Sequence, residues 1–249
     1  MPKVRLDQAL VERGLCISRE QAKRAILAGL VRAAGQLVCK PGALVPSDAP
    51  LTLAATERYV SRGGYKLEHG LRHFELQVAG VTAIDLGAST GGFTDCLLQH
   101  GAARVYAIDV GRGQLMWKLR RDSRVTVMEQ TNARFLTRRD FPPDFAGADL
   151  IVADCSFISL QKILPPAIAL LADCGRILAL VKPQFEAGKA EASRGKGVIR
   201  DPAIHARVLN ELKTFASETA GLRWKGEPAS PLLGPAGNKE FLVLLEKKP

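Results

Sequence analysis

The carboxylate of Asp85 and the glycine-rich loop after it are spaced as a ligand-binding turn requires. A continuous apolar run, 81–86, contains Asp85 near its end, and a loop with three glycines follows it. A helical pattern opens at Phe93. A glycine lets the backbone come close to a ligand, and the start of the helix behind it offers free N–H groups. The pattern predicts a buried parallel strand, a tight turn and a helix that together hold a nucleotide-like cofactor.

The spacing of the glycines separates three classes of cofactor site. A phosphate-binding P-loop needs Lys and then Ser or Thr after its last glycine, but Phe93 and Thr94 follow Gly92. A dinucleotide fingerprint needs glycine where Ser89 stands. An acid-x-Gly strand end with a loop of small residues remains, which is the form that S-adenosylmethionine (SAM) methyltransferases use. A purely structural glycine turn stays open as the alternative.

A second apolar run, 104–109, ends in Asp109, where such folds place the acid that binds a ribose. Asn132 follows a third predicted strand, where methyltransferases of this class commonly contact adenine. The residues expected to hold the cofactor are Asp85, Gly87, Ala88, Ser89, Thr90, Gly91, Gly92, Phe93, Asp109 and Asn132.

The composition narrows the class of protein. The chain has 249 residues, of which 47% are hydrophobic, and a net charge of +10, which favours a polyanionic partner. Its five cysteines form no C-x-x-C pair, so we expect a reduced, cytoplasmic chain without structural zinc or disulfides. The N-terminus has no signal-peptide core, and the best apolar run, 163–172, is short. Neither secretion nor a membrane span is expected.

Alternating apolar runs and helical patterns predict an α/β fold with a doubly wound sheet over most of the chain. A helix containing Lys66 precedes the first strand, and a helix is expected over Gln114 to Arg121. The remaining predicted strands are Val125 to Glu129, Leu150 to Ala153, Arg176 to Val181, Leu222 to Glu227 and Phe241 to Glu246. Asp154 and Lys182 therefore stand at the carboxyl edge of the sheet, where open α/β folds bind ligands.

The N-terminal stretch is a separate basic module. Apolar residues at helical spacing end at Gly14, and Ser18 with Gln21 forms a capping box that opens a second helix. Short strands around Gly35 follow. Basic side chains crowd the two helices, which fits binding to a phosphate backbone. The residues assigned to RNA binding are Arg5, Arg19, Lys23, Arg24, Lys40 and Arg62.

This stretch resembles the alpha-L RNA-binding domain of ribosomal proteins, pseudouridine synthases and tyrosyl-tRNA synthetases. The matching residues are R-L-D at 5–7, S-R at 18–19, G-L-V at 29–31, Gly35 and K-P-G at 40–42. Ala34 departs from the asparagine that this domain usually carries there, so the turn is expected to differ. We place the RNA-binding domain at 1–56, a small-residue linker at 54–57 and the second domain at 57–249.

Four charged residues, Lys66, Asp154, Lys182 and Glu240, stand near element ends on one edge of the predicted sheet. Each alone is compatible with a surface charge or a salt bridge. Their order resembles the tetrad of the FtsJ-like ribose 2′-O-methyltransferases, and nearly the whole chain resembles the TlyA (hemolysin A) family of ribosomal RNA methyltransferases. The matching motifs are Y-V-S-R-G-G, D-L-G-A-S-T-G-G-F-T-D, D-V-G-x-G-Q-L, T-N-A-R, D-C-S-F-I-S-L, L-V-K-P-Q-F-E, G-V-I-R-D-P and G-N-x-E.

The resemblance implies SAM-dependent methylation of a cytidine ribose in ribosomal RNA, on a Rossmann-like sheet whose last strand is antiparallel. The enzyme must aim a weakly nucleophilic hydroxyl at the methyl group and ease loss of its proton. We assign Lys182 as the residue contacting the hydroxyl and Asp154 as its orienting partner, with Lys66 and Glu240 completing the network. The sequence leaves open which group accepts the proton.

The sequence motifs favour other activities less. Methylation of a base amine favours an N-P-P-Y-like motif where D-C-S-F stands, and methylation of cytosine carbon needs a cysteine in a P-C context, whereas Cys155 follows Asp154. The four histidines show no metal-binding spacing. A non-catalytic RNA-binding or ribosome-assembly protein remains an alternative, and a membrane-lysing protein a weaker one. The oligomeric state and the ribosomal subunit are not given by the sequence.

Overall fold

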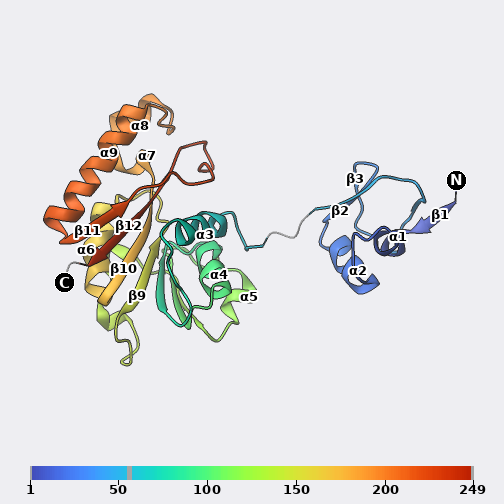
Figure 1. Ribbon diagram of the computed structural model, residues 1–249, viewed down its shortest axis with the longest axis horizontal. Coiled ribbons are helices and arrows are strands. Elements are labelled where there is room, and N and C mark those ends of the chain that lie inside the picture. The colour runs from blue at the N-terminus through green and yellow to red at the C-terminus, as the bar shows by residue number, and fades with distance from the viewer. Residues whose placement is uncertain (1, 55–57, 248–249) are drawn as a thin grey trace. The chain divides into compact units, whose positions relative to one another are not determined.

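The computed structural model describes residues 2–54 and 58–247, which fall into two compact units, Met1–Arg58 and Tyr59–Pro249 (Figure 1). The predicted domain boundary at 56/57 and most of the predicted linker lie at 55–57, outside the described residues.

The first unit packs two helices against short antiparallel strands. Its helices are α1 (Leu6–Glu12) and α2 (Arg19–Leu27), and its strands are β1 (Lys3–Arg5), β2 (Val31–Ala33), β3 (Gln36–Leu37), β4 (Leu44–Pro46) and β5 (Leu51–Leu53). β1 pairs with β4, and β2 lies between β3 and β5. Ser18 caps α2 by accepting the Gln21 N–H at 3.2 Å, as predicted, and the buried side chains of Leu10 and Ile26 form part of the core.

The second unit is built on a seven-stranded sheet of order β11-β12-β10-β9-β6-β7-β8. The strands are β6 (Thr82–Leu86), β7 (Arg104–Ile108), β8 (Val125–Met128), β9 (Ala148–Ala153), β10 (Leu171–Val181), β11 (Leu222–Gly226) and β12 (Phe241–Lys247). β12 is antiparallel to both of its neighbours, which confirms the predicted antiparallel last strand. β6 lies between β7 and β9, so the chain reverses its direction of winding there, and ligands bind at such a point in open α/β sheets.

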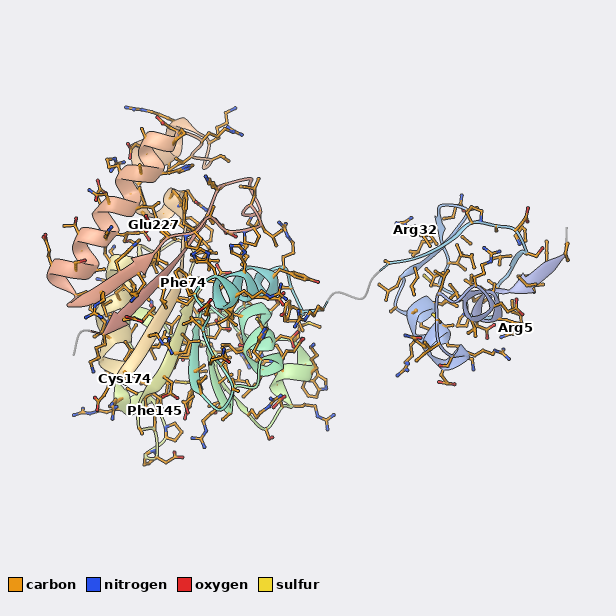
Figure 2. All side chains as sticks on the ribbon, viewed as in Figure 1. Arg5, Arg32, Phe74, Phe145, Cys174 and Glu227 are labelled. Atoms are coloured by element: carbon orange, nitrogen blue, oxygen red, sulfur yellow. The ribbon has the colours of Figure 1, made fainter. Side chains whose placement is uncertain are left out.

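Helices cover both faces of this sheet (Figure 1). One face packs against α3 (Gly63–His73), α4 (Gly92–Gln99) and the short α5 (Trp117–Arg120), and the other against α6 (Leu160–Leu170) and α9 (Pro202–Thr214). The short α7 (Pro183–Glu186) and α8 (Lys189–Arg194) connect β10 to α9. Alternate residues of β6 serve the two faces, because Ala83 belongs to one apolar cluster and Ile84 to the other. Side chains fill the space on both sides of the sheet (Figure 2).

The helix expected over Gln114 to Arg121 is shorter than predicted. α5 begins only at Trp117, since Met116 has an extended backbone with ψ 138°. The preceding N–H groups of Gln114 and Leu115 donate to the Glu129 carboxylate instead of entering a helix. A long-range acceptor, which the local pattern does not reveal, therefore keeps this segment a loop.

Candidate active site

A cavity of about 490 Å³ opens at the carboxyl ends of the central strands. Its size is within the range of small-molecule sites. Gly87 and Asp109, which follow β6 and β7, line it together with Ser89, Asn132 and Asp154. Four of the ten predicted cofactor residues thus face the cavity, and the other six do not line it.

The glycine loop owes its shape to close packing. A Cβ at Gly87 would lie 3.0 Å from the Asp154 carbonyl oxygen, so glycine lets the ends of β6 and β9 approach. Gly91 has φ 98°, and a Cβ there would collide with Leu119 and lie 2.8 Å from Leu115 Cδ1. Gly91 therefore serves the packing of the loop against the segment that follows β7 and does not face the ligand space.

Asp85 lies beneath the loop and is fully buried. Its Oδ2 accepts the Thr94 hydroxyl at 2.7 Å. Burial, together with the nearby carboxylates of Asp154 and Asp109, raises the pKa of Asp85 to about 7. This carboxyl therefore joins the end of β6 to α4, and it does not line the cavity.

Asp109 holds the backbone of the cavity wall that follows β7 in place. Its carboxylate accepts the Ser89 N–H at 2.8 Å and the Gly111 N–H at 2.7 Å. The Asn132 side chain accepts the Arg134 N–H at 3.0 Å and so begins a short 3₁₀ turn, Ala133–Phe135. Both residues thus hold backbone in place at the cavity, and Asp109 keeps unused lone pairs for hydroxyl donors.

The four charged residues form two ion pairs. Lys182 Nζ lies 2.5 Å from Asp154 Oδ1 and donates to Ser156 Oγ at 2.8 Å. Lys66 Nζ lies 2.6 Å from Glu240 Oε2, and both side chains are buried. Lys182 follows β10, and Glu240 precedes β12 beside the last paired residues, Val181 and Phe241. Both pairs thus lie at the edge where the sheet presents the carboxyl ends of its parallel strands.

Two residues of D-C-S-F that the sequence analysis left without a role also belong to this site. Ser156 binds the Lys182 ammonium, as described above. Phe157 lines the cavity with a side chain that is 90% exposed, and its backbone has φ 64°. An exposed aromatic ring on a strained backbone is a signal of function that only the structure supplies.

Cys155 lines the cavity but is not set up as a nucleophile. Burial, with the neighbouring Asp154 carboxylate, raises the pKa of its thiol to about 12. The thiol donates to the Leu86 carbonyl at 3.4 Å. A thiolate is the nucleophilic form of cysteine, so this residue is a wall of the cavity.

The residues assigned to RNA binding have different surroundings. Arg5, labelled in Figure 2, and Arg19 both donate to the buried carboxylate of Asp7 at 3.0 Å, although each remains about half exposed. Arg62, in the second unit, donates to the Leu233 carbonyl at 3.1 Å. Arg24 and Lys40 are exposed, and Lys23 lies 3.8 Å from Glu20. Part of the charge therefore serves the fold, and Lys23, Arg24 and Lys40 are the better placed for phosphates.

Comparison with known proteins defines the class. Residues 59–247 match the model of the FtsJ-like methyltransferases, and residues 4–49 match that of the S4 domain. Both halves of the resemblance seen in the sequence are thereby confirmed. The protein is an FtsJ-like, SAM-dependent methyltransferase that carries an RNA-binding S4 domain.

The relatives narrow the family further. YqxC of Bacillus subtilis, provisionally named an rRNA methyltransferase, is 51% identical over 98% of this chain and 85% of its own. The 16S/23S rRNA (cytidine-2′-O)-methyltransferase TlyA of Mycobacterium tuberculosis is 47% identical over 98% of this chain and 90% of its own. A solved structure from Streptococcus thermophilus, described as a hemolysin, is 47% identical with a TM-score of 0.74, covering 100% of this chain and 90% of that one. The chain belongs to the TlyA (hemolysin A) family.

The cavity fits SAM. Asp109 offers a carboxylate for ribose hydroxyls, and Ile108, Val110 and Ala133 supply apolar walls for a purine. Asp154 lines the same space, with its carboxylate paired to Lys182. Over the described ranges 2–54 and 58–247, no helix is long and apolar enough to cross a membrane.

Proposed function

We propose that this protein transfers a methyl group from SAM to the 2′-hydroxyl of a cytidine ribose in ribosomal RNA. The observation that carries the proposal is the ion pair between Lys182 and Asp154, because Asp154 lines the cofactor cavity. The identity to a named rRNA (cytidine-2′-O)-methyltransferase over nearly the whole chain supports the substrate. A substrate within a ribosomal subunit also implies a cytoplasmic location.

The residues divide the work between aiming the hydroxyl and stabilising charge. Bound SAM supplies an activated methyl group. The Lys182 ammonium has three N–H donors, and the weakest of its contacts runs to the Asp154 carbonyl at 3.3 Å. We assign that donor to the ribose oxygen, where it stabilises the charge that develops as the proton leaves. Asp154 and Ser156 hold the ammonium in place, and the Lys66–Glu240 pair fixes the neighbouring strand end.

We assign Phe157 as the side chain on which the target base stacks. Single-stranded or unstacked bases are commonly held by stacking on aromatic side chains. The exposed ring of Phe157 lines the cofactor cavity, and its centroid lies 4.9 Å from that of Phe185. The exposed Lys and Arg side chains of the S4 domain bind the RNA phosphates independently of the RNA sequence.

Nucleoside mapping tests this function. Both ribosomal subunits from cells lacking the protein are incubated with it and with methyl-labelled SAM, and the rRNA is digested to nucleosides. Label in 2′-O-methylcytidine is expected. Label in a base, or none in either subunit, contradicts the proposal. Once the position is known, a fragment with 2′-deoxycytidine at that position is the control, because it must accept no label.

A further inference from the structure

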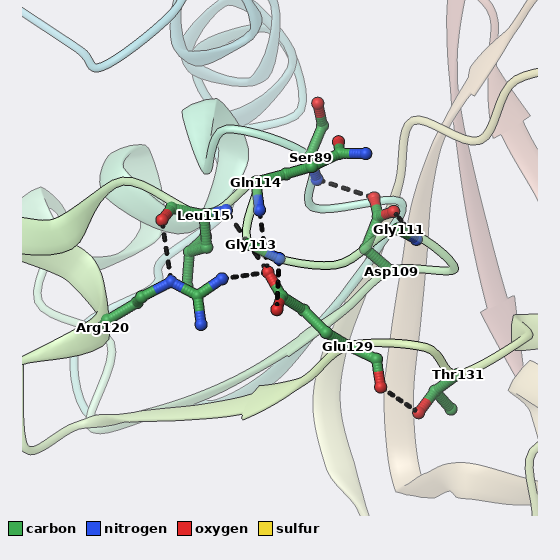
Figure 3. Close-up of polar contacts among 9 residues, drawn as sticks. All are labelled: Ser89, Asp109, Gly111, Gly113, Gln114, Leu115, Arg120, Glu129 and Thr131. Atoms are coloured by element: carbon green, nitrogen blue, oxygen red, sulfur yellow. Dashed lines mark hydrogen bonds and ion pairs between the residues drawn. The ribbon is translucent and has the colours of Figure 1, made fainter.

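Glu129 anchors the loop that forms one wall of the cofactor cavity (Figure 3). It directly follows β8, and its carboxylate accepts the N–H groups of Gly113 at 2.7 Å, Gln114 at 3.1 Å and Leu115 at 3.4 Å. The Arg120 guanidinium pairs with the same carboxylate. Four donors thus converge on one side chain that is only 14% exposed.

The anchored loop reaches the cavity although Glu129 does not. Val110 and Gln114 line the cavity beside Asp109, whereas Glu129 is absent from its walls. Arg120 closes the loop a second time, because its Nε donates to the Leu115 carbonyl at 3.0 Å. A change at Glu129 therefore acts on the cofactor only through the position of this loop.

We propose that Glu129 is a positioning residue that sets the adenosine half of the SAM site. The inference rests on the proposed function only in taking SAM as the occupant of the cavity. The negative charge is essential to it: a carboxylate is an acceptor at both oxygens, and every one of its loop partners is a donor. In Glu129→Gln the size is kept, but the amide NH₂ must face an N–H or the guanidinium.

Calorimetric titration with three ligands tests the proposal. SAM, S-adenosylhomocysteine and 5′-methylthioadenosine share the adenosine half and differ at the methionine end. For Glu129→Gln we expect the Kd of all three to rise by the same factor, about 10- to 100-fold, which is the loss typical of a hydrogen bond to a charged group. The rate of methyl transfer at saturating SAM should stay that of the wild type.

A matched control is Glu246→Gln, which also removes a carboxylate from an ion pair, with Lys225 at 3.5 Å on β12 and β11. Its Kd values should be unchanged. Should Glu129→Gln not fold, Glu129→Asp gives the same readout, because its shorter carboxylate cannot reach all the loop donors.

Each contrary outcome has a distinct meaning. Unchanged Kd values with a lower melting temperature, or a loss no larger than in the control, show a merely structural role and overturn the proposal. A loss for SAM that 5′-methylthioadenosine does not share overturns it as well, since the effect then lies at the methionine end. If the wild type itself binds none of the three, the cofactor assignment fails rather than the role of Glu129.

Discussion

Lys66 Nζ lies 2.6 Å from Glu240 Oε2 in a buried ion pair that spans 174 positions of the chain. The pair ties the first turn of α3 to the start of β12. Removing one partner of such a pair leaves the other charge buried and unpaired, which costs far more than the pair contributes.

We expect Lys66→Met to lower the free energy of unfolding of the second unit by about 3–5 kcal/mol. The double variant Lys66→Met/Glu240→Leu should regain most of that stability without regaining methyl transfer. Urea titration followed by tryptophan fluorescence measures it, since Trp117 and Trp224 both lie in this unit. A single variant as stable as the wild type would contradict the structural role of the pair, and an active double variant would contradict its role in methyl transfer.

The affinity for RNA should depend on Lys23 and Arg24. Replacing both with alanine removes the exposed Arg24 and the partly buried Lys23, so the magnitude of the slope of log K against log salt should decrease by about one per lost contact, with little sequence dependence. Arg207→Ala on α9 serves as the control, because that arginine is already engaged by Glu191 and Glu211. RNA affinity and salt slope equal to the wild type would make these two charges an ordinary solvated surface.

Acid should loosen the first unit through Asp7. Hydrogen bonds from Arg5 and Arg19 hold the pKa of Asp7 at about 2, below its usual value near 3.8. A depressed pKa means that the stabilisation is complete above about pH 4 and is lost as the pH falls toward 2. The protection factors of the α1 amides, corrected for the intrinsic exchange rate at each pH, should therefore fall over that window in the wild type. In Asp7→Asn they should be lower at neutral pH and constant over the window, and an equally steep fall there would assign the acid sensitivity elsewhere.

The stability of the first unit should increase when Ala34 is replaced in its hairpin turn. Ala33 pairs with Gln36, so Ala34 and Gly35 form a two-residue hairpin turn, and their φ angles are 50° and 79°. Such a turn favours Asn-Gly, and left-handed backbone costs an alanine about 1–2 kcal/mol. Ala34→Asn should stabilise the first unit by about 0.5–1 kcal/mol in denaturant titrations followed by its amide NMR signals. Ala28→Asn, at a right-handed position, should gain nothing, and equal effects at both sites would remove the backbone explanation.

Local sequence patterns were sufficient to predict the parallel strands that position the site. Apolar runs ending in Asp85, Asp109 and Asp154 identify parallel strands, and the ends of parallel strands must share one edge. The antiparallel last strand and the place of Lys66 and Glu240 in one network were implied by the family resemblance. The ion pair between these two residues is seen only in the structure, because neither periodicity nor spacing contains that contact.

Features that depend on contacts distant in sequence were not predictable. Gly91 looked like a ligand-facing glycine, but its neighbours are Leu115 and Leu119. The local pattern predicts a helix for the loop before α5, because the contact with Glu129 exists only once β8 lies beside β7. The sequence pattern gave no sign that Asp7 would accept hydrogen bonds from two of the predicted RNA-binding arginines.

Single-turnover methyl transfer by Lys182→Ala tests the central claim most directly. SAM and RNA should still bind, while the rate falls by about 10²- to 10³-fold, because the stabilised charge exists only in the transition state. Lys225→Ala, at an exposed lysine outside the cavity, should keep the wild-type rate. Label transferred by the wild type should also protect the adjacent bond from alkaline hydrolysis. Transfer at full rate by Lys182→Ala, or wild-type label on a base, would contradict the ribose mechanism.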